Sequence, residues 1–259
     1  MIDLPTIATF AAVIADSRFP AALAIAALAG LVRGFSGFGS ALVYIPLMSA
    51  VYGPRVAAVT FVLSDIVTGA LFLAGVWRKA SWREVLPIAA AAIFAAQFGA
   101  LVLQYSDPVA LRWSITALVA AAIAVLASGW RYHGRPMLAI TIGVGLMAGL
   151  LGGAVQISGP PIIVYWFGSG HLAEVLRANF FAYFTLFSAA SIATYAVHGM
   201  ITATMLALAA FFTPLNMIGM WAGSRLFHFA SEQTYRRVGY AVIALAALVS
   251  LPLLDRFLR

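Results

Sequence analysis

The chain has 259 residues, of which 64% are hydrophobic and only 9% are charged. Soluble domains are about 45–50% apolar and about 25% charged, so these few charges are too sparse to cover a surface exposed to water. The composition excludes a soluble enzyme and a disordered segment, and it indicates an integral membrane protein. The absence of Cys excludes disulfides and Cys nucleophiles. The basic residues are scattered at the ends of apolar runs, which favours membrane orientation over nucleic-acid binding as their role.

Runs of about 20 apolar residues, the length that crosses a bilayer core of roughly 30 Å, predict eight helical elements. They cover approximately residues 19–52, 54–77, 84–105, 108–130, 137–167, 173–197, 200–227 and 235–258. A polar linker at 131–136 separates a first transmembrane repeat, 1–130, from a second, 137–259. The apolar stretch at 7–15 follows Asp3 instead of positive charge, so we interpret it as an interfacial lead-in and not as a cleaved signal.

The two halves repeat the same order of elements, an over-long broken helix followed by three uninterrupted spans. Gly30 and Gly34 in the first half match Gly149 and Gly153 in the second at an offset of 119 residues. A shared order of elements at a fixed offset indicates an internal duplication.

Basic residues in corresponding loops lie on opposite sides of the predicted membrane. The loops after the second and seventh elements are basic, with Arg78, Lys79 and Arg83 in one and Arg225, Arg236 and Arg237 in the other. Their counterparts offer only His198 and Arg112. Because Lys and Arg prefer the cytoplasm, this pattern favours inverted repeats, with elements one and five as re-entrant hairpins. If these two elements cross the membrane fully, the repeats are parallel instead.

The two helix breaks, at residues 34–40 and 152–161, are the best indication of a binding site. Non-helical backbone inside hydrocarbon must be buried in protein or line a wet cavity, because unpaired amides are costly in lipid. Ser158 suits a helix N-cap and the two prolines after Gly159 suit a first turn, so a half-helix is expected to begin there. A second half-helix could begin near Ser40. Both N-termini would direct N–H groups at the membrane centre and favour an anion. Alternatively, the glycines serve close helix packing alone.

Charged residues at membrane depth are costly and usually functional. Arg33 precedes the first break, and Asp65 lies near the middle of the second element. Arg33 either neutralises a substrate or pairs with Asp65.

Other polar residues in the predicted spans have two interpretations each. Gln97 and Asn216 match at the 119-residue offset, and Gln156 lies in the second break. Each of these amides either faces a cavity or makes an interhelical hydrogen bond. Arg177 and Asn179 open the sixth element, and Arg177 either joins the site or extends to the membrane interface.

An enzyme is a weaker alternative. The segment from Gly34 to Gly37 has the Gly-x-Ser-Gly form of rhomboid-type intramembrane serine proteases, with Ser36 as the nucleophile and His198 as a conceivable base. The sequence has no His/Glu metal constellation and no Gly-rich loop followed by Lys, so metal-dependent and nucleotide-hydrolysing activities have no support. We expect no enzyme activity, no cofactor and no metal.

The segment 30–46, Gly-Leu-Val-Arg-Gly-Phe-Ser-Gly-Phe-Gly-Ser-Ala-Leu-Val-Tyr-Ile-Pro, with 157–161 and 177–179, resembles the sulfite exporter TauE/SafE family of membrane transporters. The resemblance extends over essentially the whole chain. It implies a bacterial inner-membrane, multi-pass permease for small sulfur-containing or carboxylated anions such as sulfite, sulfoacetate or other organosulfonates. The first break departs from the uninterrupted Gly run of many members, so Phe38 suggests a pocket shaped differently from a plain sulfite site.

We therefore predict an all-α polytopic membrane protein of two homologous four-element halves, acting as a secondary transporter of a small sulfur-containing oxyanion by alternating access. The predicted substrate-binding residues are Arg33, Ser36, Gly37, Phe38, Gly39, Ser40, Gln156, Ser158, Gly159, Pro160, Arg177 and Asn179. Asp65 is the candidate for proton coupling, and Gln97 and Asn216 complete the cavity if they face it. A passive anion channel is the alternative. The expected partners are the anion and the lipid bilayer but no nucleic acid, and a homodimer is left open.

Overall fold

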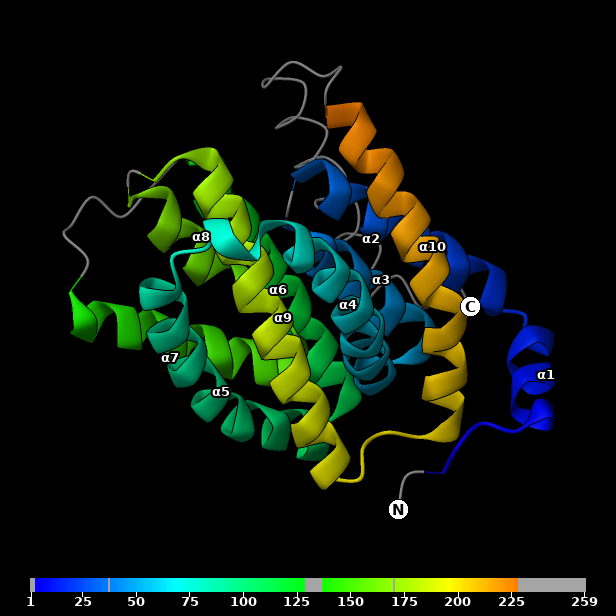
Figure 1. Cartoon of the computed structure of the whole chain (residues 1–259). Helices are drawn as coiled ribbons and strands as arrows, with labels where there is room; N and C mark the ends of the chain where they lie inside the picture. The colour runs from blue at the N-terminus through cyan, green and yellow to red at the C-terminus, as the bar shows by residue number, and fades with distance from the viewer. Residues whose placement is uncertain (1–2, 37, 129–136, 170, 228–259) are drawn as a thin grey trace.

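The computed structural model describes residues 3–36, 38–128, 137–169 and 171–227. These residues form α-helices joined by short connections, with no β-strand among them. The helices are α1 (Ile7–Ala15), α2 (Phe19–Ser36), α3 (Ser40–Tyr52), α4 (Pro54–Val76), α5 (Trp82–Tyr105), α6 (Pro108–Ala127), α7 (Leu138–Val155), α8 (Gly159–Phe167), α9 (Ala173–Val197) and α10 (Ala203–Phe227), with a 3₁₀ turn, η1 (Trp77–Lys79), after α4. Figure 1 places α2 and α10 on one side of the bundle, α5 and α7 on the other, and α4 and α9 between them.

The predicted all-α polytopic membrane fold is confirmed. In the described part of the chain, six helices are long and apolar enough to cross a membrane: α4, α5, α6, α7, α9 and α10. The two expected interruptions fall between α2, which ends at Ser36, and α3, and between α7, which ends at Val155, and α8. The predicted linker at 131–136 and the eighth element at 235–258 lie outside the described residues.

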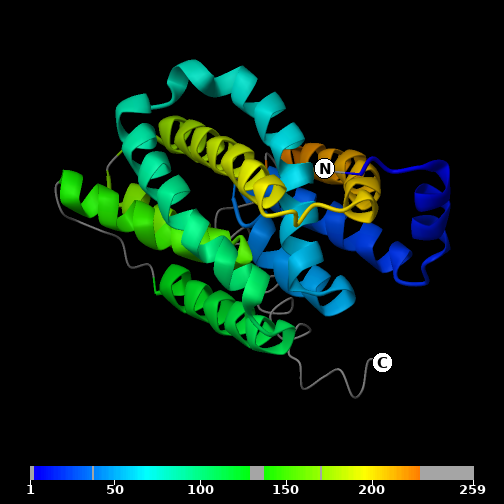
Figure 2. The same cartoon turned by 90° about the horizontal axis from the view of Figure 1, so that it is seen from below.

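The short helix α1 packs against α10, where the ring centres of Phe10 and Phe211 are 5.8 Å apart. It meets α2 at an angle of 91° and lies at the outer edge of the molecule in both views (Figures 1 and 2). Its start is closed by a capping box in which Thr6 and Thr9 bond to each other's backbone N–H groups.

Three pairs of corresponding helices begin at the same spacing. α2 and α7 are both 18 residues long and begin at Phe19 and Leu138. The half-helices α3 and α8 begin at Ser40 and Gly159, and the next spans, α4 and α9, at Pro54 and Ala173. Each pair of starts differs by the 119 residues that the sequence repeat predicts.

The first helix of each half packs against the third element of the other half. Gly30 and Gly34 of α2 lie so close to the backbone of Asn216 and Met220 of α10 that an added methyl group would overlap a carbonyl oxygen. Residue numbers rise together along the two helices, so α2 and α10 run parallel. Glycine allows this close approach, which is a common way for helices to associate in lipid.

The same kind of contact joins α7 to α5. The close pairs are Gly145 with Ile88, Gly149 with Ala92, and Gly153 with Ala96. These two helices also run parallel. The regularly spaced glycines of α2 and α7 therefore serve packing, and both helix breaks follow them in the chain.

The corresponding helices α4 and α9 pack against each other at the centre and run antiparallel. Along this contact Lys79 pairs with Glu174 at 2.7 Å, the rings of Phe72 and Phe181 stack with centroids 5.4 Å apart, and Ser188 Oγ donates to Asp65 Oδ2 at 2.9 Å. Residue numbers fall along α9 as they rise along α4 and η1. The two halves thus meet along corresponding helices of opposite direction.

Each broken element folds back on itself. The guanidinium of Arg18, just before α2, lies 4.5 Å from the ring centre of Tyr52 at the end of α3. The hydroxyl of Thr141, near the start of α7, lies 2.7 Å from that of Tyr165, near the end of α8. With 13 and 9 residues, α3 and α8 are too short to cross a bilayer core of roughly 30 Å at about 1.5 Å per residue. The chain therefore enters and leaves each hairpin at the same end.

Candidate functional site

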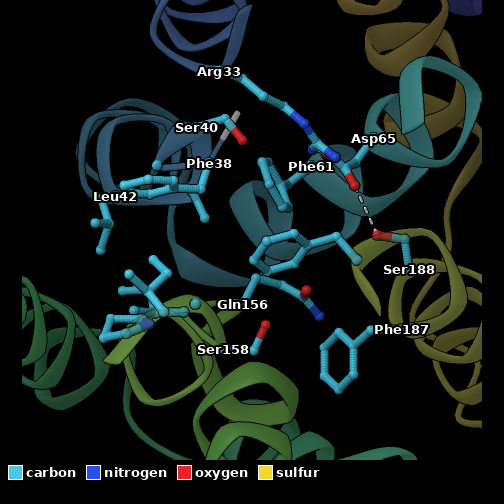
Figure 3. Close-up of a pocket in the computed structure, with 17 residues that line it drawn as sticks. Arg33, Phe38, Ser40, Leu42, Phe61, Asp65, Gln156, Ser158, Phe187 and Ser188 are labelled. Carbon is cyan, nitrogen blue, oxygen red and sulfur yellow. Dashed lines mark hydrogen bonds and ion pairs between the residues drawn. The ribbon is translucent and has the colours of Figure 1, made fainter. Parts of the chain in front are cut away.

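The two helix breaks meet at one pocket. Its lining comes from both breaks, from the half-helices that follow them, and from the central helices α4 and α9. The lining residues are Arg33, Phe38, Gly39, Ser40, Ala41, Leu42, Phe61, Asp65, Gln156, Ile157, Ser158, Gly159, Pro160, Ile163, Phe184, Phe187 and Ser188. Figure 3 shows the first-half side chains facing those of the second half across this space.

Two helix N-termini open on the pocket. Gly39 precedes α3 with a φ of 88°, a left-handed conformation that favours glycine, and Ser158 precedes α8. Neither residue caps its helix through a side-chain hydrogen bond. Free N–H groups in a first helical turn, with the positive end of the helix dipole, attract an anion. The expected start of a half-helix after Ser158 is confirmed, but the Ser158 hydroxyl faces the pocket instead of capping the helix (Figure 3).

A buried ion pair forms one side of the pocket. Arg33, in the last turn of α2, pairs with Asp65 of α4, and the two residues are 3% and 5% exposed. Ser188 of α9 donates to the second carboxylate oxygen of Asp65 (Figure 3). Two guanidinium nitrogens of Arg33, Nε and Nη2, have no hydrogen-bond partner among the described residues. They are buried cationic donors with unused capacity, which an anion or water can satisfy.

Aromatic rings form the other walls. Phe38, Phe61, Phe184 and Phe187 all line the pocket. The Phe38 ring lies 5.8 Å from that of Phe180 on α9, which joins the first break to the second half. A pocket with a few polar groups among apolar walls has the usual composition of a small-molecule site.

Most of the predicted site residues lie at this pocket. They are Arg33, Phe38, Gly39, Ser40, Asp65, Gln156, Ser158, Gly159 and Pro160. Of the other predicted residues, Gly37 lies outside the described part of the chain. Ser36 is the last residue of α2, and its side chain is not among those described. The remaining four, Gln97, Arg177, Asn179 and Asn216, do not line the pocket.

Three of the four outlying residues make contacts between segments. Gln97 donates to Thr194 on α9 at 2.7 Å, and Asn216 donates to a backbone carbonyl of α2 at 3.3 Å. The buried Asn179 accepts a hydrogen bond from the backbone N–H of Ser81, just before α5. Arg177 is exposed on the first turns of α9. For Gln97 and Asn216 the structure thus shows an interhelical hydrogen bond, one of the two interpretations that the sequence allowed.

The sequence did not single out Phe61, Phe184, Phe187 and Ser188 as site residues. Phe187 and Ser188 follow Phe184 by three and four residues, the spacing that puts side chains on one face of a helix. That spacing is visible in the sequence. The contact of this face with Asp65 depends on the antiparallel packing of α4 and α9, which no local pattern encodes.

A bundle of long apolar helices with two broken hairpins around a buried pocket defines an integral multi-pass membrane protein. The model of the sulfite exporter TauE/SafE family matches residues 22–250 of the chain. The chain therefore belongs to the sulfite exporter TauE/SafE family and is a membrane transporter.

The chain is also similar in sequence to a curated protein. Over 227 residues the chain is 28% identical to the probable sulfite/organosulfonate exporter TauE of Cupriavidus necator, with 84% of this chain and 88% of the relative covered. No solved structure matches the chain.

Proposed function

We propose that the protein is a secondary transporter that exports a small sulfur-containing oxyanion across the bacterial inner membrane. The observation that carries this proposal is the meeting of two half-helix N-termini, from corresponding positions in the two halves, at one pocket beside Arg33. Helix N-termini at broken segments are a recurrent way to bind anions inside membranes. The similarity to a probable sulfite/organosulfonate exporter supports this substrate class.

The two halves act as inverted repeats in this proposal, with the broken elements as re-entrant hairpins. The antiparallel packing of α4 on α9 supports it, because full crossing of both broken elements would make these two helices parallel. The loop at 77–81 lies near the start of α9 through the Lys79–Glu174 and Glu84–His171 pairs. Both regions then lie at the cytoplasmic face, in agreement with the basic loop after α4. Rocking of one half against the other would expose the pocket alternately to each side.

The oxyanion is held by both breaks. The Ser40 and Ser158 hydroxyls donate from opposite sides, and the first-turn N–H groups of α3 and α8 add backbone donors (Figure 3). Arg33 supplies the positive charge. The phenylalanine walls suit the carbon chain of an organosulfonate better than sulfite alone.

Proton coupling through Asp65 follows from the charge balance of the pocket. Arg33 and Asp65 together are neutral, so an anion entering beside them leaves a net negative charge in a buried site. Burying uncompensated charge is costly, and a proton on Asp65 removes that cost. Anion and proton therefore bind together.

Flux measurements in proteoliposomes test this function. Vesicles that contain the purified protein are loaded with sulfite or sulfoacetate, and efflux is followed with and without the same anion outside. A carrier exchanges anion for anion faster than it moves anion alone, whereas a passive channel shows no such stimulation. Absence of protein-dependent flux for every sulfur oxyanion would contradict the proposal.

A further inference from the structure

Gln156 has an unusual backbone conformation for its side chain. It follows the last residue of α7 with a φ of 57° and a ψ of 23°, in the left-handed region, and no other described non-glycine residue has a positive φ. Glycine adopts this conformation without steric cost. In the first half, the residue that matches Gln156 at the 119-residue offset is a glycine, Gly37. Non-glycine residues held in such conformations are often found at functional sites, where the surrounding structure maintains them.

The orientation of the Gln156 amide is fixed by hydrogen bonding. Its Nε2 donates to the Tyr195 hydroxyl at 2.8 Å, and that hydroxyl donates to the Gly153 carbonyl at 3.3 Å. The single hydroxyl proton of Tyr195 is used on Gly153, since a carbonyl can only accept. Tyr195 must therefore accept from Gln156, which requires the NH₂ group to face Tyr195.

The Gln156 carbonyl oxygen is consequently the atom left for the pocket. Gln156 lines the pocket, and Oε1 receives no hydrogen bond from any described residue (Figure 3). The other strong acceptor, the Asp65 carboxylate, already bonds Arg33 through one oxygen and Ser188 through the other. Gln156 Oε1 is thus a pocket acceptor of fixed orientation that no described residue uses.

We propose that Gln156 selects oxyanions that carry their own hydrogen-bond donor, such as a hydroxylated sulfonate or a protonated sulfite. A carbonyl oxygen accepts a hydrogen bond from such a donor, and it repels a fully deprotonated oxyanion at the same place. A buried acceptor left unpaired disfavours an analogue that lacks the donor. Tyr195 is the positioning residue that keeps the carbonyl directed at the substrate. The inference rests on the proposed anion transport and names the substrate class of the same site.

A matched pair of ligands tests this selectivity. 2-Hydroxyethanesulfonate and ethanesulfonate differ only by a hydroxyl group, and their dissociation constants are measured by titration of the purified protein. We expect the hydroxylated ligand to bind about tenfold more tightly to the wild type. Tyr195→Phe frees the amide to turn, and Gln156→Gly removes it while keeping a residue suited to a positive φ. In both variants the ratio of the two constants is expected to fall towards one.

The outcomes separate the selectivity from the transport function. Equal binding of the two sulfonates to the wild type, or an unchanged ratio in the folded variants, would overturn the role of Gln156 and leave anion transport standing. Failure of the folded wild type to bind either sulfonate or sulfite would contradict the proposed function itself, and the selectivity with it. If Gln156→Gly does not fold, Tyr195→Phe alone decides, because it leaves the Gln156 backbone untouched.

Discussion

Arg33 and Asp65 form an ion pair that joins α2 to α4 beside the pocket. The Ser188 hydroxyl donates a hydrogen bond to the carboxylate oxygen of Asp65 that does not contact Arg33. The sequence allowed two roles for Arg33, pairing with Asp65 or neutralising a substrate, and the structure shows the pairing. It leaves two guanidinium nitrogens of Arg33 without a partner among the described residues, so pairing with Asp65 and contact with an anion are compatible. In the proposed site, the charge of Asp65 controls how strongly Arg33 attracts that anion.

Asp65→Asn removes this negative charge at nearly constant volume. We expect the anion to bind about tenfold more tightly at neutral pH, because it no longer shares Arg33 with a carboxylate. The pH dependence of flux that the proposed coupling produces should be lost, because the group that carries the proton is gone. Titration and proteoliposome flux measure the two effects. Ser188→Ala is the control, which removes one hydrogen bond and keeps the charge; flux of Asp65→Asn with wild-type pH dependence would refute coupling through Asp65.

Arg33→Gln should abolish anion binding and also destabilise the protein. Removing one partner of a buried ion pair costs about 3–5 kcal/mol, because the other charge is left uncompensated. The double variant Arg33→Gln with Asp65→Asn removes both charges, so we expect its melting temperature to recover while anion binding stays absent. Anion binding by the double variant at wild-type affinity would show that Arg33 is not part of the site.

Gly149→Ala tests the close packing of α7 on α5. The added methyl group would overlap the carbonyl oxygen of Ala92, and overpacking of this kind costs about 1–3 kcal/mol. Gly143→Ala on the same helix is the matched control, since nothing lies within 4 Å of its added methyl group. We expect a lower melting temperature for the first variant and an equal or higher one for the second. Equal shifts in both would contradict the packing role.

The proposed re-entrant topology predicts which residues share a face of the membrane. Because the chain has no Cys, single introduced cysteines can be labelled with an impermeant thiol reagent without background. Met137 and Leu172 are 59% and 77% exposed and flank the α7–α8 hairpin. We expect Met137→Cys and Leu172→Cys to react from one face and Ser17→Cys from the opposite face. Reaction of Met137→Cys and Leu172→Cys from opposite faces would mean that the broken element crosses the membrane.

Local sequence patterns predicted much of the fold. Apolar runs of membrane-spanning length, interrupted by Gly, Ser and Pro, located both helix breaks to within a few residues. The 119-residue offset predicted which helices correspond. These signals are local because helix formation and helix interruption depend on neighbouring residues and on the lipid solvent.

The partners of each helix could not be predicted in the same way. Gln97 and Asn216 are polar in apolar spans, but only tertiary packing decides that they bond Thr194 and the α2 backbone instead of facing the pocket. Likewise the position of Ser188 beside Asp65 depends on a contact between residues 123 apart in sequence. Arg33 and Asp65 were identifiable because any charge at membrane depth needs a partner.

The most direct test of an anion site at the two breaks is a thermal-shift titration of the purified protein with sulfite, sulfoacetate, small carboxylates and chloride. A ligand that binds only the folded state raises the melting temperature by mass action. We predict a selective rise with a sulfur oxyanion, lost in Ser158→Ala and kept in Ser49→Ala, a buried serine of α3 that does not line the pocket. No rise with any anion, or an undiminished rise in Ser158→Ala, would contradict the account.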